Sequence, residues 1–152
     1  MKPGDLAPDF ELPDETGTPR KLSDLLAGGP VVLFFYPAAM TKGCTVESCH
    51  FRDLAAEFAA AGASRVGISP DAVDKQQAFS EKHSFDFPLL SDADGAVATQ
   101  FGVRRSFGPL LTRRQTFVID TDRKVLEVVK SEFRMAVHAD RALEVLRTRS
   151  AS

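Results

Sequence analysis

The chain is poor in cysteine and tryptophan: its 152 residues include two cysteines and no tryptophan at all. Two cysteines are too few to cross-link a disulfide-stabilised scaffold. A chain of this length also buries about two thirds of the surface that its unfolded form exposes, so its core needs no covalent support. We therefore expect the cysteines to serve chemistry rather than architecture.

A surplus of charge of either sign is lacking as well. Lysine and arginine together number 19, and aspartate and glutamate number 21, which gives a net charge of −2. Because nucleic-acid-binding domains usually carry a basic surplus, this balance argues against nucleic acid as the main partner.

Long apolar runs are also missing. The longest, residues 31–36, is far shorter than the roughly 20 residues that a membrane-spanning helix needs, so we expect no membrane anchor. The first ten residues contain no apolar stretch typical of a signal peptide. These observations favour the reducing cytoplasm, where a pair of cysteines is more often catalytic or metal-binding than structural.

The hydrophobic pattern predicts one domain over residues 1–152, with a polar tail at about 148–152. Residues 31–36 are continuously apolar between two prolines, which is typical of a strand buried on both faces at the centre of a sheet. The other predicted elements are a hairpin at 9–21, a helical turn capped by Ser23, a helix at 45–61, a strand at 65–69, a helix at 71–82, an extended piece at 87–90, a short helix at 94–101, a basic loop at 103–113, strands at 116–119 and 125–129, and a helix at 139–147. This order predicts an α/β sandwich with a mixed sheet, whose parallel half comes from right-handed crossovers.

The most informative segment, residues 37–49, links the predicted central strand to the helix that follows it. Ligands usually bind at this edge of an α/β sheet. Cys44 falls in the first turn of the helix, where unpaired backbone N–H groups and the helix dipole stabilise a thiolate over a thiol. Thr41 is placed to point its hydroxyl toward the sulfur, and Gly43 lets the backbone approach closely. The alternative is a small, buried, inert cysteine, but this position and the second cysteine, Cys49, favour a reactive thiol.

The spacing Pro37-x-x-x-Thr41-x-x-Cys44 is the active-site signature of the peroxiredoxins. The chain resembles the bacterioferritin-comigratory, or Q-type, subfamily of that family over most of its length. The segments that carry the resemblance are residues 35–53, 67–69, 88–92 and 114–120. The resemblance implies a thioredoxin-like three-layer sandwich with a mixed central sheet and an N-terminal hairpin extension.

The resemblance also implies a role for individual residues. Cys44 would be the peroxidatic cysteine, Cys49 the resolving cysteine and Arg114 the active-site arginine, with Pro37 and Gly43 beside the substrate. No metal, flavin or haem is required, and a thioredoxin-type dithiol would be the reductant. The Gly-Gly-Leu-Gly and Tyr-Phe segments of typical two-cysteine peroxiredoxins are absent. Their absence argues against a ring, and the subfamily resemblance implies a monomer, with a dimer as the alternative.

The expected chemistry is the reduction of hydrogen peroxide or an organic hydroperoxide. The thiolate attacks the terminal oxygen, and the Thr41 hydroxyl, the Cys44 backbone N–H and the Arg114 guanidinium are available to stabilise the developing charge. The resulting sulfenic acid condenses with Cys49, and a dithiol reduces the disulfide. Because five helical residues rise by about 7.5 Å, the helix must unwind locally before the two cysteines can bond.

Several polar residues admit two interpretations. Glu47, one turn after Cys44, either orients an arginine or solvates the helix, whereas Arg104, Arg105 and Arg113 are better explained by a solvated loop. The function also has an alternative of another class, a redox-sensing binding protein with little turnover. A sensor and an enzyme need the same reactive thiol, so the sequence leaves both open.

A metal site and a disulfide reductase are weaker hypotheses. Cys-x4-Cys followed by His50, with His83 and His138 elsewhere, lacks the spacing of a structural zinc site. Thioredoxin-like reductases use Cys-x-x-Cys and a proline before the facing strand, where this chain has Arg114 and Gln115.

Overall fold

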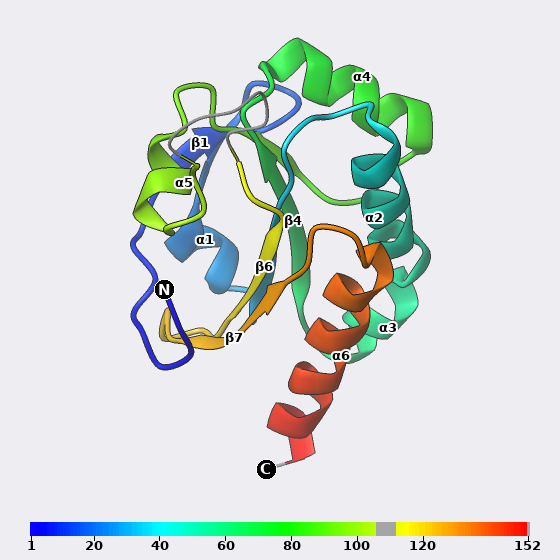
Figure 1. Ribbon diagram of the computed structural model, residues 1–152. Helices are drawn as coiled ribbons and strands as arrows, with labels where there is room; N and C mark the ends of the chain where they lie inside the picture. The colour runs from blue at the N-terminus through cyan, green and yellow to red at the C-terminus, as the bar shows by residue number, and fades with distance from the viewer. Residues whose placement is uncertain (106–111, 152) are drawn as a thin grey trace.

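The computed structural model describes residues 1–105 and 112–151, and within them shows a five-stranded sheet in the order β5-β4-β3-β6-β7 (Figure 1). Its strands are β3 (Val31–Phe35), β4 (Ser64–Ser69), β5 (Leu89–Ser91), β6 (Gln115–Ile119) and β7 (Val125–Lys130). Strand β4 pairs in parallel with β3 and β5, whereas β6 pairs antiparallel with β3 and β7. The predicted mixed sheet is confirmed.

Helices cover both faces of this sheet, which gives the three predicted layers (Figure 1). They are α1 (Leu22–Leu26), α2 (Lys42–Asp53), α3 (Ala55–Ala60), α4 (Val73–His83), α5 (Ala96–Gln100) and α6 (Met135–Ala151). Every residue of β3 is buried, and alternate side chains enter two separate cores. Leu33 and Phe35 pack toward α1 and α5, whereas Val32 and Phe34 pack toward α2, α3, α4 and α6.

The predicted N-terminal hairpin is confirmed, with strands β1 (Glu11–Pro13) and β2 (Pro19–Lys21) paired antiparallel. The helix after it does not begin as predicted. Ser23 does not cap it, because α1 already begins at Leu22 and has no side-chain cap. The backbone N–H of Ser23 donates instead to Asp9 Oδ1 at 2.9 Å, which ties α1 to the hairpin.

The helix predicted at 45–61 is wrong in its extent, because two helices, α2 and α3, occupy this stretch. They are separated at Leu54, whose backbone angles of −97° and 22° are not helical. A residue distant in sequence supplies the physical reason. Arg65 Nη1, from β4, donates a 2.8 Å hydrogen bond to the carbonyl of Phe51, which a continuous helix would use internally.

The last helix is longer than predicted at both ends. Helix α6 begins at Met135 rather than at 139, and it continues to Ala151 through most of the predicted polar tail. In the predicted basic loop, residues 106–111 lie outside the described residues, and Arg104 and Thr112 on either side form an antiparallel bridge. No helix within the described ranges is long and apolar enough to cross a membrane.

Candidate active site

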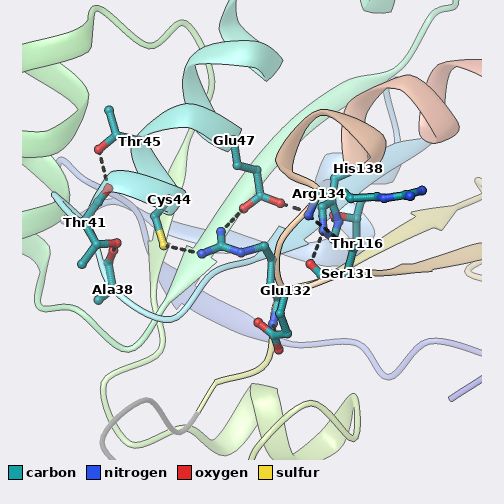
Figure 2. Close-up of polar contacts among 11 residues, drawn as sticks. Ala38, Thr41, Cys44, Thr45, Glu47, Thr116, Ser131, Glu132, Arg134 and His138 are labelled. Atoms are coloured by element: carbon teal, nitrogen blue, oxygen red, sulfur yellow. Dashed lines mark hydrogen bonds and ion pairs between the residues drawn. The ribbon is translucent and has the colours of Figure 1, made fainter.

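Cys44 and Arg114 meet at the carboxyl end of β3, although 70 positions separate them in the sequence. Cys44 lies in the first turn of α2, which follows β3. Arg114 immediately precedes β6, and the pairing of β3 with β6 sets Phe35 opposite Gln115. Arg114 therefore lies beside the end of β3. Its Nη2 donates a 3.2 Å hydrogen bond to the sulfur, drawn as a dashed line from Cys44 in Figure 2.

Glu47 holds the same guanidinium from one turn further along α2. Arg114 Nη1 donates a 2.6 Å hydrogen bond to Glu47 Oε1. Cys44 and Glu47 are fully buried and Arg114 is 5% exposed, so this charge-assisted contact is shielded from water. Burial alone would lower the pKa of Arg114, but Glu47 and Cys44 raise it, so the guanidinium stays charged. The contact favours the first interpretation of Glu47, as an arginine-orienting residue.

The main chain of Arg114 is fixed as well. Its backbone N–H donates to Glu132 Oε1 at 3.1 Å, and Arg105 Nη2 donates to the same oxygen at 2.7 Å. Arg105 thus makes a partly exposed ion pair beside the site. The guanidinium of Arg104 donates elsewhere, to the carbonyl of Asp94.

A buried histidine from α6 lies behind Glu47. His138 Nδ1 is 3.6 Å from Glu47 Oε2 and 2.8 Å from Thr116 Oγ1, while His138 Nε2 is 2.8 Å from the carbonyl oxygen of Ser131 (Figure 2). Burial raises the pKa of Glu47 to about 8, although Arg114 opposes the shift. Burial also lowers the pKa of His138.

At Gly43, α2 lies close to Met135 and Arg114. A Cβ atom built on this residue would lie 2.9 Å from Met135 Cε and 3.2 Å from Arg114 Nη2. The prediction that Gly43 permits a close backbone approach is therefore confirmed. The group that approaches is the guanidinium that contacts Cys44.

We expect Gly43→Ala to slow the first turnover with peroxide by roughly three- to tenfold, because the added methyl displaces the guanidinium from the sulfur. Stopped-flow measurement on the pre-reduced protein tests this. Gly28→Ala is the matched control, since a Cβ there meets nothing within 4 Å. Equal rates for the two variants would contradict the prediction.

The hydroxyl of Thr41 has a different partner from the predicted one. Thr41 is exposed, and its Oγ1 donates a 2.7 Å hydrogen bond to the carbonyl of Ala38 rather than pointing its proton at Cys44 (Figure 2). The tight turn before α2, in which Met40 has a φ of 67°, presents that carbonyl to the hydroxyl. The carbonyl of Thr41 itself accepts from Thr45.

The loop between β3 and α2 is anchored by Asp71, which lies just after β4. Pro37 is buried, and the backbone N–H of Ala39 donates a 2.6 Å hydrogen bond to Asp71 Oδ2, which also accepts from Ser69 Oγ at 2.7 Å. Asp71 lies at the position where the sequence pattern predicts the start of the next helix, yet α4 begins only at Val73. The side chain of Asp71 holds the loop that carries the Pro37-to-Cys44 motif.

Cys49 lies on the same continuous helix as Cys44, as predicted, and both cysteines are free. Cys49 is half-buried. Burial raises the pKa of its thiol, and Asp53 adds to this effect while Arg52 opposes it. Cys49 is therefore mostly a thiol at neutral pH while α2 is intact.

Across residues 1–105 and 112–151, no group of three or more His, Cys, Asp or Glu side chains is arranged to hold a metal ion. His50 pairs with Asp140, and His83 stacks on Phe85. Each of these histidines thus has a structural partner.

Sequence reasoning missed Glu132, His138, Thr116 and Asp71. Their partners lie far along the chain: Glu132 is 18 positions from Arg114, and Asp71 is 32 from Ala39. Glu132 and His138 lie outside the predicted strand at 125–129 and the predicted helix at 139–147, so the local pattern gave no signal for them.

The chain is a thioredoxin-like α/β sandwich. A buried cysteine lies at the start of a helix, and an arginine donates a hydrogen bond to its sulfur. These features define a thiol-based oxidoreductase. The model of the AhpC/TSA family matches residues 3–128. A putative peroxiredoxin of Mycobacterium tuberculosis is 68% identical over 149 residues, covering 97% of each chain. Peroxiredoxin Bcp of Escherichia coli is 43% identical over 152 residues, covering 97% of this chain and 96% of that protein.

Solved structures agree with these relatives. The crystal structure of peroxidoxin BcpB from Mycobacterium tuberculosis matches with a TM-score of 0.94 and 66% identity, covering 97% of both chains. A bacterioferritin comigratory protein of Xanthomonas campestris matches with a TM-score of 0.83 and 34% identity, covering 93% of this chain and 92% of that one. The chain belongs to the AhpC/TSA family and is a peroxiredoxin, a thiol-dependent peroxidase.

Proposed function

We propose that the peroxidase reaction runs through Cys44 as the attacking thiolate, with Arg114 as the residue that activates it. The observation that carries this proposal is the 3.2 Å contact between Arg114 Nη2 and the buried sulfur. A fixed cation beside a buried sulfur favours the thiolate, which is the nucleophilic form.

In the first step, the Cys44 thiolate attacks the terminal oxygen of the peroxide and the O–O bond breaks. The sulfur is oxidised to a sulfenic acid, and the leaving oxygen takes up a proton to become water or an alcohol. Charge moves from sulfur to oxygen, so the Arg114 guanidinium is placed to stabilise the transition state. The Cys44 backbone N–H and the Thr41 hydroxyl are proposed as further donors, the latter once it leaves the carbonyl of Ala38.

Pro37 and Gly43 are proposed to line the peroxide site. Cys44 is fully buried, whereas the residues just before it, Met40 and Thr41, are exposed. We infer that movement of this exposed turn admits the peroxide.

Cys49 is proposed as the resolving residue. Its thiol condenses with the sulfenic acid on Cys44, giving a disulfide and water, and an external dithiol of the thioredoxin type then reduces the disulfide by exchange. Burial holds the pKa of Cys49 up while α2 is folded. Unwinding of α2 would expose this thiol, remove that burial effect and bring it to the sulfenic acid.

We expect oxidation to unfold the part of α2 around both cysteines, because Cα atoms farther apart than about 7 Å do not bond without backbone movement. Hydrogen exchange followed by mass spectrometry should show faster exchange between about residues 45 and 52 in the oxidised protein than in the reduced protein. Strand β3 should stay protected in both forms.

Cys49→Ser, treated with peroxide in the same way, is the control for this exchange measurement, since it cannot form the disulfide within the chain. Equal protection of α2 in oxidised and reduced wild-type protein would contradict the proposed pairing. Mass spectrometry of the oxidised chain would then separate a disulfide between chains from a different resolving residue.

The substrates are proposed to include both hydrogen peroxide and organic hydroperoxides. The bacterioferritin comigratory protein of Xanthomonas campestris has alkyl peroxide reduction activity. In this chain, the exposed apolar side chains of Met40 and Val46 lie just before and just after the buried Cys44 in sequence, where an alkyl group would find apolar surface.

We further propose that the protein acts as a monomer in the cytoplasm, where dithiol reductants are available.

Steady-state peroxide consumption with thioredoxin, thioredoxin reductase and NADPH tests the proposed function. We expect continuous NADPH oxidation over many equivalents of peroxide. Peroxide consumption that stops after one equivalent per chain, with little NADPH oxidised, would instead support the redox-sensing protein.

A further inference from the structure

The carboxylate of Asp71 joins the turn at residues 37–41 to the central sheet. Its Oδ2 accepts hydrogen bonds from the backbone N–H of Ala39 at 2.6 Å and from Ser69 Oγ at 2.7 Å. Its Oδ1 pairs with Lys75 Nζ at 3.2 Å. The Asp71 side chain is 9% exposed, so the bond to Ala39 is largely shielded from water. Hydrogen bonds to an ionised group of this kind are stronger than those between neutral groups.

A buried network of hydrogen bonds fixes the direction in which Ser69 donates. Gln76 Nε2 donates to the carbonyl of Leu90 at 2.8 Å, and the amide oxygen of Gln76 accepts from the Tyr36 hydroxyl at 2.6 Å. Because the carbonyl of Leu90 can only accept, this orientation of the Gln76 amide is the one that satisfies both neighbours. Gln76 Nε2 also donates to Ser69 Oγ at 2.9 Å, which leaves the hydroxyl hydrogen of Ser69 for Asp71.

The turn that Asp71 holds contains a strained residue. Met40, next to Ala39, has a φ of 67°, in the left-handed region that residues other than glycine rarely adopt. Such a conformation persists where the surrounding structure holds it in place. The Thr41 hydroxyl supports the turn from within, through the carbonyl of Ala38 (Figure 2), and Asp71 supports it from the sheet. Loss of the Asp71 contact would therefore let the turn relax.

We propose that Asp71 is a positioning residue whose hydrogen bond to Ala39 sets the balance between a closed and an open form of this turn. In the closed form Cys44 lies buried beside Arg114, and in the open form it reaches Cys49. This inference rests on the proposed roles of the two cysteines. The bond is present in the closed form alone, so it stabilises the form that reacts with peroxide and opposes the form that makes the disulfide.

Hydrogen exchange on the reduced full chain, followed by NMR, tests the contact without peroxide. Asp71→Ala should raise the exchange rate of the Ala39 amide roughly tenfold, as expected for the loss of one hydrogen bond to a charged group. Asp74→Ala is the matched control, because it removes the same charge from an exposed position three residues further along, and it should leave that rate unchanged. Protection of β3 in the same experiment shows that each variant is folded.

Quenched-flow mass spectrometry with one equivalent of hydrogen peroxide follows the two chemical steps separately, because the reduced, sulfenic acid and disulfide forms differ in mass. In Asp71→Ala, disulfide formation should be roughly tenfold faster than in the wild type, because the open form costs less free energy to reach. The first turnover should instead be about two- to threefold slower, because the turn positions Cys44 less firmly. A substitution that merely destabilised the fold would accelerate neither step. Disulfide formation that is unchanged or slower in Asp71→Ala would overturn the proposal.

Ser69→Ala keeps the proposal testable if Asp71→Ala does not fold. It removes the hydroxyl that orients the Asp71 carboxylate. Exchange of the Ala39 amide and disulfide formation should both become about threefold faster, a smaller effect because the bond to Ala39 is weakened rather than lost. A Ser69→Ala variant that coincided with Asp74→Ala in both measurements would contradict the role of Asp71.

The wild-type chain in the quenched-flow experiment separates this inference from the proposed mechanism. If the wild type formed no sulfenic acid on Cys44, or no disulfide with Cys49, the proposed mechanism itself would fail. If the wild type formed both, and the Ala39 amide exchanged equally fast in Asp71→Ala and Asp74→Ala, the role of Asp71 alone would be refuted.

Discussion

Replacing Cys44 by serine should abolish peroxide reduction altogether. A serine hydroxyl is not ionised near neutral pH and is a poor nucleophile toward an O–O bond, so even a neighbouring guanidinium cannot activate it. The volume change is small, and the fully buried position should accept the hydroxyl beside Arg114. Peroxide consumption by the pre-reduced variant, measured against an enzyme-free blank, should be indistinguishable from that blank.

Cys49→Ser separates the two cysteines by role and is the matched control for this prediction. It should complete one stoichiometric turnover at close to the wild-type rate and then stop with a sulfenic acid on Cys44, which a dimedone adduct detected by mass spectrometry would reveal. If both variants lost the first turnover equally, the assignment of Cys44 as the attacking residue and Cys49 as the resolving residue would be wrong.

Removal of the guanidinium should have the next largest effect. Arg114→Ala should slow the first turnover by about 100-fold, the usual loss when one donor to a developing charge is deleted. It also leaves the Glu47 carboxyl group buried without its 2.6 Å partner, so the melting temperature should fall too. Stopped-flow kinetics and thermal unfolding measure the two effects separately.

Arg113→Ala is the control for Arg114→Ala, because Arg113 is the exposed neighbour in the chain and its replacement removes the same charge. It should leave the first turnover within about twofold, as is usual for a screened surface charge. Arg114→Lys should recover only part of the lost rate. A single ammonium group cannot contact both Cys44 and Glu47 as the two terminal nitrogens of the guanidinium do. Equal effects of the two alanine substitutions would place Arg114 outside the site.

The fold was predictable where local patterns dominate. The continuous apolar run at β3 predicts a strand buried on both faces, and the apolar runs at β6 and β7 predict the paired strands that follow it. Helix limits were less predictable, because they depend on partners distant in sequence. Leu54 interrupts a pattern that predicts one helix, and the cause is Arg65 on β4, 14 positions from the carbonyl that it binds.

The candidate site likewise contains some features that the local sequence predicts and others that depend on residues distant in sequence. Cys44, Cys49 and Gly43 belong to one local motif, and their positions in α2 could be inferred from it. The contact of Arg114 with Glu47 was left as one of two interpretations, since the two residues are 67 positions apart and are brought together by the pairing of β3 with β6. The orientation of the Thr41 hydroxyl was mispredicted because a local turn offered it a carbonyl.

The interruption at Leu54 has a consequence for the energetics of turnover. Because the Phe51 carbonyl is occupied by Arg65, α2 and α3 need not melt together, and Phe58 on α3 can remain in the core while α2 opens. If the disulfide between Cys44 and Cys49 forms as proposed, the cooperative unit that unfolds is then about three turns of helix rather than five. A short unfolding unit keeps the free-energy cost of opening α2 small. The helix can then unfold and refold repeatedly while the other helices still cover the sheet and protect it from aggregation.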